Sequence, residues 1–104
     1  LVVMTRPEGY RKPPMRRHEI EVLQRLYARY PALVQAVVDR PENYNRTVEE
    51  LEHLRSQGRA YLFRPERMPI ANGELRYDRI VTAFEAGLAQ ARRELPAIEA
   101  FLAG

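Results

Sequence analysis

The pattern of apolar and polar positions begins with a short apolar run, and a second run follows past the middle of the chain. The runs are LVVMTR at 1–6 and AYLFR at 60–64, and each is stopped by a proline, Pro7 or Pro65. A continuous apolar run is typical of a strand buried on both faces, as in a parallel sheet. Because helical patterns separate the two runs, we expect two short strands that pair in parallel through a right-handed crossover.

Between these strands, apolar residues recur at intervals of three and four, which is the spacing of one face of a helix. The residues of this series are Ile20, Leu23, Tyr27, Tyr30, Val34 and Val37. We expect the helical pattern to begin at Met15, because the adjacent Pro13 and Pro14 exclude a helix before it. Pro31 should divide the series into two helices, since a proline holds the residue before it out of the α region.

A third helix should follow the second. Asp39 and Arg40 end the second helix in this interpretation, and Pro41 suits the first position of the next one. Thr47 and Glu50 have the spacing of a capping box, so a restart at Thr47 is an alternative. The apolar face of this stretch comprises Tyr44, Val48, Leu51 and Leu54.

Glycine and proline punctuate the rest of the chain. Gly58 should end the third helix, and the pair Asn72-Gly73 should form a turn in the loop that follows the second strand. Asp78 can then cap a last helix, which Pro96 should break. The apolar face of this helix comprises Ile80, Phe84, Leu88, Ala91 and Leu95.

Together these patterns predict an α/β fold that is predominantly helical. It has two short parallel strands (about 1–6 and 60–64), three crossover helices and a C-terminal helix. With 104 residues, the chain should form a single domain, 1–104. Two strands make a poor sheet alone, and the chain begins at Leu1 inside the first of them. We therefore expect a piece of a longer polypeptide that carries the rest of the sheet, or other copies of the chain that pair with these strands.

Composition narrows the class of protein. Hydrophobic residues make up 45% of the chain and charged residues 30%, which fits a globular rather than a disordered protein. No apolar run approaches the ~18 residues of a transmembrane helix, and no signal peptide is recognisable, so we expect a cytoplasmic or peripheral membrane protein. Cysteine is absent, which excludes disulfides and thiolate metal sites.

The net charge of +3 is unevenly distributed along the chain. The excess of positive charge lies in one short segment, with Arg11, Lys12, Arg16 and Arg17. Such a segment could contact anionic lipid head groups, or it could form a solvated rim or an interdomain contact. Nucleic acid is disfavoured as a partner, because Glu19 and Glu21 dilute the charge and Tyr10 is the only nearby aromatic residue that could stack on a base.

No constellation of catalytic or metal-binding residues stands out. Ser56 lies outside any G-x-S-x-G motif, and His18 and His53 are too far apart in the sequence for a histidine cluster. The neighbouring Glu49 and Glu50 point in different directions on a helix, and the glycines form no phosphate-binding loop. We therefore predict no catalytic residue, no metal site and no cofactor in this chain.

The triplet Arg-Pro-Glu occurs three times, at residues 6–8, 40–42 and 64–66. The middle copy is a helix junction in the predicted fold. The outer copies end the two strands, so Arg6 and Arg64 should leave the sheet at the same edge, with Arg40 elsewhere. Open α/β sheets tend to bind ligands at this edge. We expect Arg6 and Arg64 to form salt bridges within the fold, with an anion or a lipid head group as the alternative.

Four longer passages, taken in order, are more specific than any of these features. They read VVMTRPEGYRKPP at 2–14, RLYARYPALVQAV at 25–37, RPENYNRTVEELEHLRSQGRAYLFRP at 40–65 and RIVTAFEAG at 79–87. The series resembles the C-terminal region of bacterial patatin-like phospholipases. The resemblance covers residues 2 to about 92, and the third passage is the most specific because of its length.

The resemblance implies a parent enzyme that hydrolyses acyl esters of lipids with a Ser–Asp dyad. That family places the serine in G-x-S-x-G and the aspartate in D-G-G or D-G-A, and neither motif occurs in this chain. Asp39 and Asp78 stand in D-R-P and D-R-I instead. We therefore expect a non-catalytic accessory domain whose partner is a patatin catalytic domain upstream in the same polypeptide. The alternative is a self-standing module that oligomerises or that binds an anionic membrane or another partner.

Overall fold

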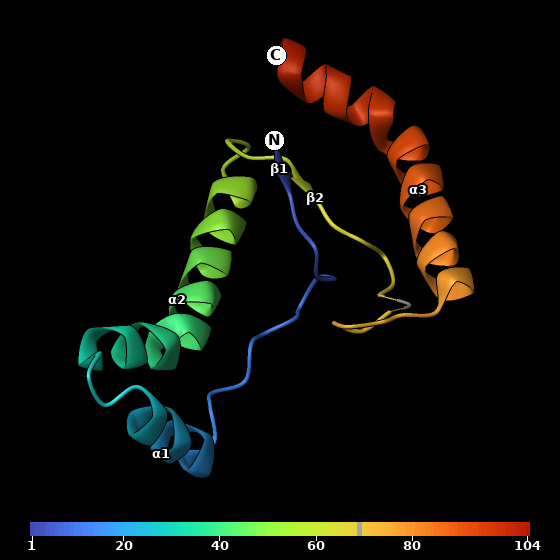
Figure 1. The fold of residues 1–104 in the computed structure, drawn as a ribbon. Helices are drawn as coiled ribbons and strands as arrows, with labels where there is room; N and C mark the ends of the chain where they lie inside the picture. The colour runs from blue at the N-terminus through green and yellow to red at the C-terminus, as the bar shows by residue number, and fades with distance from the viewer. Residues whose placement is uncertain (69) are drawn as a thin grey trace. The chain divides into compact units, whose positions relative to one another are not determined.

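A computed structural model describes residues 1–68 and 70–104, which form two strands and three helices (Figure 1). In chain order these elements are β1 (Val2–Val3), α1 (Arg17–Leu26), α2 (Pro31–Ser56), β2 (Leu62–Phe63) and α3 (Tyr77–Ala103). Most of the chain is helical and the two strands pair in parallel, so the predicted class, a predominantly helical α/β fold, is confirmed.

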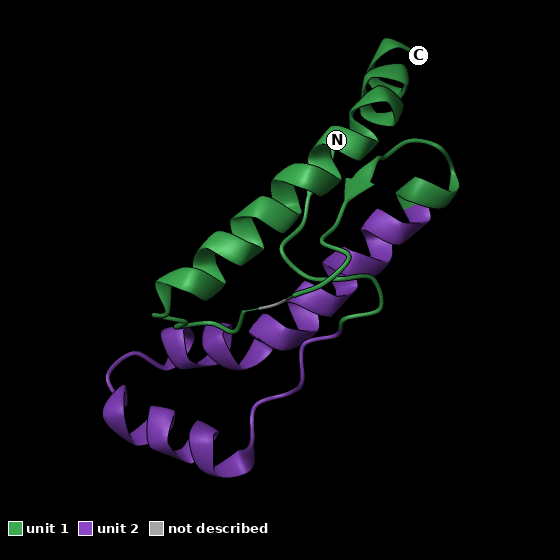
Figure 2. Cartoon of the chain, turned by 90° about the vertical axis from the view of Figure 1, so that its right-hand side faces the viewer, with its two compact units in different colours: residues 1–10, 54–104 green, residues 11–53 purple. Residues whose placement is uncertain are grey.

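The described residues group into two units (Figure 2). Unit 1 comprises residues 1–10 and 54–104, and it holds both strands and α3. Unit 2 comprises residues 11–53, and it holds α1 and most of α2.

The two strands pair in the predicted direction but are shorter than the apolar runs. Val2 lies opposite Leu62 in the register, and the Val2 and Met4 N–H groups each donate a hydrogen bond of 2.8 Å, to the carbonyls of Tyr61 and Phe63. The next bond of this ladder would need an N–H group from Pro65, which has none. Each strand therefore spans two residues rather than the five or six predicted.

Helices α1 and α2 are separated at Pro31, as predicted. Helix α1 begins at Arg17, two residues after the predicted start at Met15. Its first turn is fixed by Glu19, whose carboxylate accepts a hydrogen bond of 2.8 Å from the Arg16 backbone N–H. The chain leaves α1 at Leu26, turns, and enters α2 with Pro31 as the first helical residue.

Helix α2 runs without interruption to Ser56, so the predicted helix junction at Arg40 and Pro41 is wrong, and two helices rather than three connect the strands. Pro41 is buried inside the helix, where a proline removes one backbone hydrogen bond and bends the axis without ending it. Figure 1 shows this bend in the first half of α2. The restart at Thr47 is also wrong, because the Thr47 hydroxyl donates to the Asn43 carbonyl within the helix, at 2.9 Å.

Gly58 ends α2 in the predicted way. Its φ angle is +69°, a left-handed conformation that glycine adopts without strain. The Gly58 N–H bonds to the Arg55 carbonyl and the Arg59 N–H to the Leu54 carbonyl, both at 2.9 Å. These two bonds form the Schellman arrangement, which uses the last carbonyls of the helix and turns the chain towards β2.

The predicted turn at Asn72-Gly73 leads into α3. Gly73 has a φ angle of +81°, and the Glu74 N–H bonds to the Ala71 carbonyl at 3.2 Å. The Glu74 carboxylate in turn accepts a hydrogen bond of 3.0 Å from the Arg76 backbone N–H, just before the helix begins. This bond is the main reason why the pKa of Glu74 is lowered, and its ion pair with Arg79 adds to the shift.

Helix α3 corrects two predictions about its ends. It begins at Tyr77, so Asp78 lies inside the first turn and makes an ion pair of 2.8 Å with Arg76 instead of capping the helix. It also continues through Pro96 to Ala103, where the sequence predicts a break. Pro96 is exposed, so the helix can bend around the missing hydrogen bond without disturbing a packed interior.

Few apolar side chains are buried in the part of the chain that the structure describes. Beside Pro41, these are Val34 and Val48 of α2, both in unit 2. In unit 1 the buried side chains are polar: Arg64 is 9% exposed and Gln90 is 5% exposed. Buried polar groups need hydrogen-bond partners, so the residues around Arg64 and Gln90 form the candidate site.

Candidate functional site

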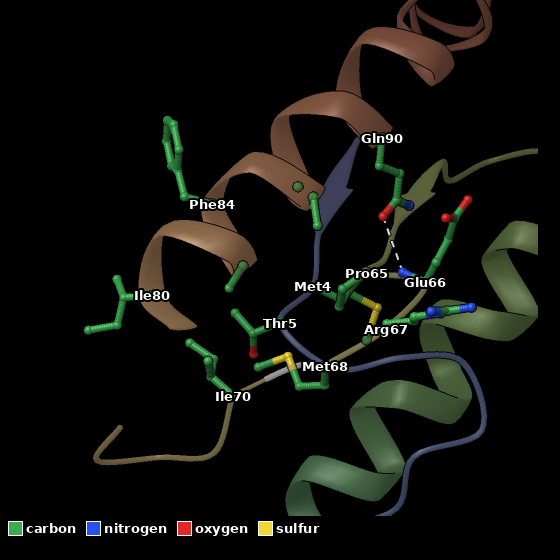
Figure 3. Close-up of a pocket in the computed structure, with 13 residues that line it drawn as sticks. Met4, Thr5, Pro65, Glu66, Arg67, Met68, Ile70, Ile80, Phe84 and Gln90 are labelled. Carbon is green, nitrogen blue, oxygen red and sulfur yellow. Dashed lines mark hydrogen bonds between the residues drawn. The ribbon is translucent and has the colours of Figure 1, made fainter. Parts of the chain in front are cut away.

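Gln90 of α3 binds the backbone of the chain just after β2. Its side-chain NH₂ group donates to the Arg64 carbonyl, and its amide oxygen accepts a hydrogen bond of 3.1 Å from the Glu66 N–H (Figure 3). The Tyr61 and Phe63 carbonyls accept hydrogen bonds from β1. Because successive carbonyls alternate in direction along an extended chain, the Arg64 carbonyl and the Glu66 N–H point away from β1. The amide of Gln90 thus takes the place of a neighbouring strand at the edge away from β1.

A carboxylate from the next turn of α3 extends this network. Glu94 accepts one hydrogen bond from the Gln90 side chain, at 2.8 Å, and another from the Tyr61 hydroxyl, at 2.9 Å. The bond to Glu94 is the main cause of a raised pKa at Tyr61, followed by burial and by the negative charge of Glu94. The Tyr61 ring also packs against Phe101, with the ring centres 5.9 Å apart.

The side chain of Arg64, a predicted site residue, contacts Met4 and Glu8, which follow β1. Its Nε atom lies 3.3 Å from the Met4 sulfur, and one of its terminal nitrogens lies 3.7 Å from a carboxylate oxygen of Glu8. The same Glu8 oxygen lies 2.9 Å from a terminal nitrogen of Arg55. The expected salt bridge of Arg64 within the fold is therefore present, and Glu8 is shared by two arginines.

Arg6, its predicted companion, follows β1 at the same edge of the parallel pair but binds elsewhere. Its guanidinium group donates to the Asn72 side chain at 3.3 Å and lies 5.0 Å from the centre of the Tyr10 ring. In the observed register Met4, and not Arg6, is level with Arg64. The two arginines thus follow the strands at the same end of the parallel pair, as predicted, but contact different partners. Arg40 belongs to α2, in unit 2.

A cavity of about 410 Å³ lies beside Met4 in unit 1. Figure 3 shows Met4 and Thr5 from the segment just after β1, Met68 and Ile70 from the loop after β2, and Ile80 from α3. Phe84 stands at the rim, where its ring is largely exposed. The lining is mostly apolar, so this cavity suits a hydrocarbon group rather than a charged ligand.

The four basic residues at 11–17 lie in unit 2 and make different contacts. The Lys12 ammonium group lies 5.8 Å from the centre of the Tyr44 ring, and its backbone N–H donates to the Asn45 side chain at 2.7 Å. Arg17 makes an exposed ion pair of 3.1 Å with Glu21. Arg11 and Arg16 are also exposed, so three of the four predicted residues lie at the surface, two of them at the start of α1 and Arg11 in the segment before it.

The sequence interpretation missed Gln90 and the cavity. A single glutamine inside a helical pattern gives no local signal, and its backbone partners are 24 and 26 residues away in the sequence. The sequence indicated part of the cavity lining, because Ile80 and Phe84 belong to the predicted apolar face of α3. Among the described residues, no three histidine, cysteine, aspartate or glutamate side chains are placed to hold a metal ion.

Comparison with family models assigns the chain to one protein family. Residues 30–103, which include the whole of α2, β2 and α3, match the family described as "Domain of unknown function (DUF6363)", and the chain belongs to that family. No curated protein and no solved structure matches the chain. Within the described residues, no helix is long and apolar enough to cross a lipid bilayer.

Proposed function

We propose that this chain is the non-catalytic C-terminal accessory domain of a patatin-like phospholipase, an enzyme that hydrolyses acyl esters of lipids. The observation that carries the proposal is the incomplete sheet. In the described residues β1 pairs only with β2, and Val3 of β1 is 68% exposed. Parallel strands are normally covered on both faces and belong to larger sheets, so the outer edge of β1 suits a strand of another domain.

The resemblance names the class of that other domain. The passage at 2–14 contains β1, and the passage at 40–65 contains the end of α2 and the whole of β2. These two passages therefore form the sheet and its connection, which is the part of the fold that would join a catalytic domain. The mostly apolar cavity beside Met4 is compatible with a protein that handles acyl chains.

The role of the domain would be structural. The only serine, Ser56, is the last residue of α2, and the G-x-S-x-G and D-G-G or D-G-A motifs of the patatin dyad are absent from the sequence. We therefore assign the chemistry to the upstream catalytic domain. The accessory domain would complete the edge of its sheet and shape the access of the lipid.

The most direct test is the coding sequence immediately upstream of this segment. The proposal expects one continuous reading frame that encodes a G-x-S-x-G motif followed by D-G-G or D-G-A. A frame that encodes neither motif would contradict the assignment to patatin-like enzymes.

A second test uses the chain alone. With p-nitrophenyl esters of short fatty acids, the purified chain should show no turnover above that of a Ser56→Ala variant. Turnover that disappears in Ser56→Ala would show that the chain carries its own nucleophile, and the accessory role would then be wrong.

One observation favours oligomerisation as a second candidate function. Along α3, apolar residues follow alternating steps of three and four, the spacing of a coiled-coil seam: Val81, Phe84, Leu88, Ala91, Leu95, Ile98 and Leu102. Several of these side chains are exposed, among them Phe84, Leu88 and Leu95. This candidate predicts a dimer in sedimentation equilibrium that a Leu88→Asp substitution dissociates, whereas a well-folded monomer at all concentrations would exclude it.

A further inference from the structure

Helix α1 is the most weakly buried element of unit 2. None of its ten residues is buried. Its apolar face is divided: Ile20 and Leu23 are half-buried, whereas Val22 and Leu26 are exposed, Leu26 by 72% of its surface. Val22 and Leu26 are four residues apart and therefore lie next to each other on the helix surface. Tyr30, just beyond the helix, is also exposed.

The charge of unit 2 is divided between its two halves. Residues 11–30 contain six arginines and lysines and two glutamates, a net charge of +4. Residues 31–53 contain two arginines and five acidic residues, a net charge of −3. The positive half is thus the segment that includes α1 and the basic residues before it.

Positive charge and exposed apolar surface meet on α1. Arg25 is exposed and lies three residues after Val22, so the two side chains are neighbours on the helix surface. Arg16 and Arg17 are exposed at the N-terminal end of the same helix. A short helix with an exposed apolar strip and basic residues at its border is the arrangement by which peripheral proteins lie on anionic lipid.

We infer that α1, together with the basic segment before it, binds the surface of an anionic membrane. Val22 and Leu26 would enter the boundary between head groups and acyl chains, while Arg11, Arg16 and Arg25 would contact lipid phosphates. A second copy of the chain is a poorer occupant, because two identical segments of net charge +4 repel each other across a symmetric contact. This inference does not depend on the proposed accessory role and needs no enzyme activity to test it.

The test is co-sedimentation of the purified chain with vesicles. Vesicles of phosphatidylcholine mixed with phosphatidylglycerol should bind the chain at low ionic strength, whereas vesicles of phosphatidylcholine alone should not. Added salt should weaken the binding, because it screens the contacts between arginines and phosphates. Equal binding to both vesicles, or binding to neither, would overturn the inference.

Matched variants locate the contact. Leu26→Ser should reduce binding several-fold, and Arg25→Ala should reduce it roughly fivefold, as expected for one basic residue near an anionic surface. The controls are Leu75→Ser, just before α3, and Arg92→Ala on α3, which alter an exposed leucine and an exposed arginine of unit 1 and should leave binding unchanged.

Circular dichroism of all four variants checks that the helices remain folded. If the unit 1 controls lose as much binding as the α1 variants while keeping their helicity, the contact does not lie on α1. Salt-sensitive self-association without lipid, combined with no vesicle binding, would assign the positive segment to the acidic half of another copy instead.

Discussion

The Gln90 side chain supplies the backbone hydrogen bonds that a very short sheet lacks just after β2. Its amide supplies a donor and an acceptor to the backbone just past β2, at the edge that faces away from β1. Without these bonds, the Arg64 carbonyl and the Glu66 N–H would have to find other partners in a partly buried place. A buried polar group that loses its partner costs more than the bond itself contributed.

Replacement of Gln90 should therefore destabilise unit 1. We expect Gln90→Leu to lower the free energy of unfolding by about 2–4 kcal/mol, because two backbone groups lose their partner at once. Urea denaturation measures this change. Gln24→Leu on the exposed side of α1 is the control and should change stability by less than about 0.5 kcal/mol. Similar effects of the two substitutions would show that the Gln90 hydrogen bonds are dispensable.

Tyr61 and Glu94 make the free energy of unfolding depend on pH in the alkaline range. The raised pKa of Tyr61 means that the folded state holds the phenol proton more tightly than the unfolded state does. The stabilisation is fully present below the ordinary tyrosine pKa of 10.0, and it is lost as the pH rises through the higher value of the folded state. Spectrophotometric titration should detect a tyrosine that ionises late.

Glu94→Gln separates the causes of this shift. The glutamine can still accept the hydrogen bond from Tyr61, but it removes the negative charge, so the pKa of Tyr61 should move back towards 10.0. In Tyr61→Phe, the late-ionising tyrosine should be absent from the titration. A late-ionising group that persists in Tyr61→Phe would assign the shift to another residue.

At the scale of elements, three prolines have different effects on the helices that contain them. Pro31 starts α2, whereas Pro41 and Pro96 lie inside helices that continue past them. Sequence reasoning treats an interior proline as a break because it costs about 3 kcal/mol of helix propensity. That cost can be offset by packing, as at buried Pro41, or by a bend, and neither is visible in local sequence.

Pro96→Ala should therefore strengthen the end of α3. The substitution restores a backbone hydrogen bond at an exposed position, and we expect a gain of about 1–3 kcal/mol in local helix stability. Slower amide hydrogen exchange after residue 92 and a larger helical circular dichroism signal measure it. Pro41→Ala is the comparison and should gain less, because it also removes a buried ring. Faster exchange in Pro96→Ala would contradict this account.

Predictions from the sequence were most accurate where the backbone conformation of a single residue determines the local structure. Gly58 ended α2 and Gly73 formed a turn as expected, since both positions need a left-handed conformation. The parallel pairing also followed from two apolar runs separated by helices. The partners of Arg6, Arg64 and Gln90 could not be read in this way, because each bond joins residues that only the folded chain brings together.

At the scale of the whole molecule, apolar burial is concentrated in very few side chains of the described chain. Val48 is among the most buried of them. We expect Val48→Ala to lower the free energy of unfolding by about 1–3 kcal/mol, since it leaves a small cavity in α2's packed side. Leu75→Ala, at a leucine that is 91% exposed, should change it by less than about 0.5 kcal/mol. Thermal denaturation compares the two variants.

The position of Gln90 also limits how the sheet can grow. Because its amide occupies the edge beyond the end of β2, an incoming strand meets a hindered side there and an open side at β1. A sheet that accepts strands on one side only forms a finite complex, whereas one open on both sides can add chains without end. We therefore expect the Gln90 side chain to favour a one-to-one assembly over fibre formation.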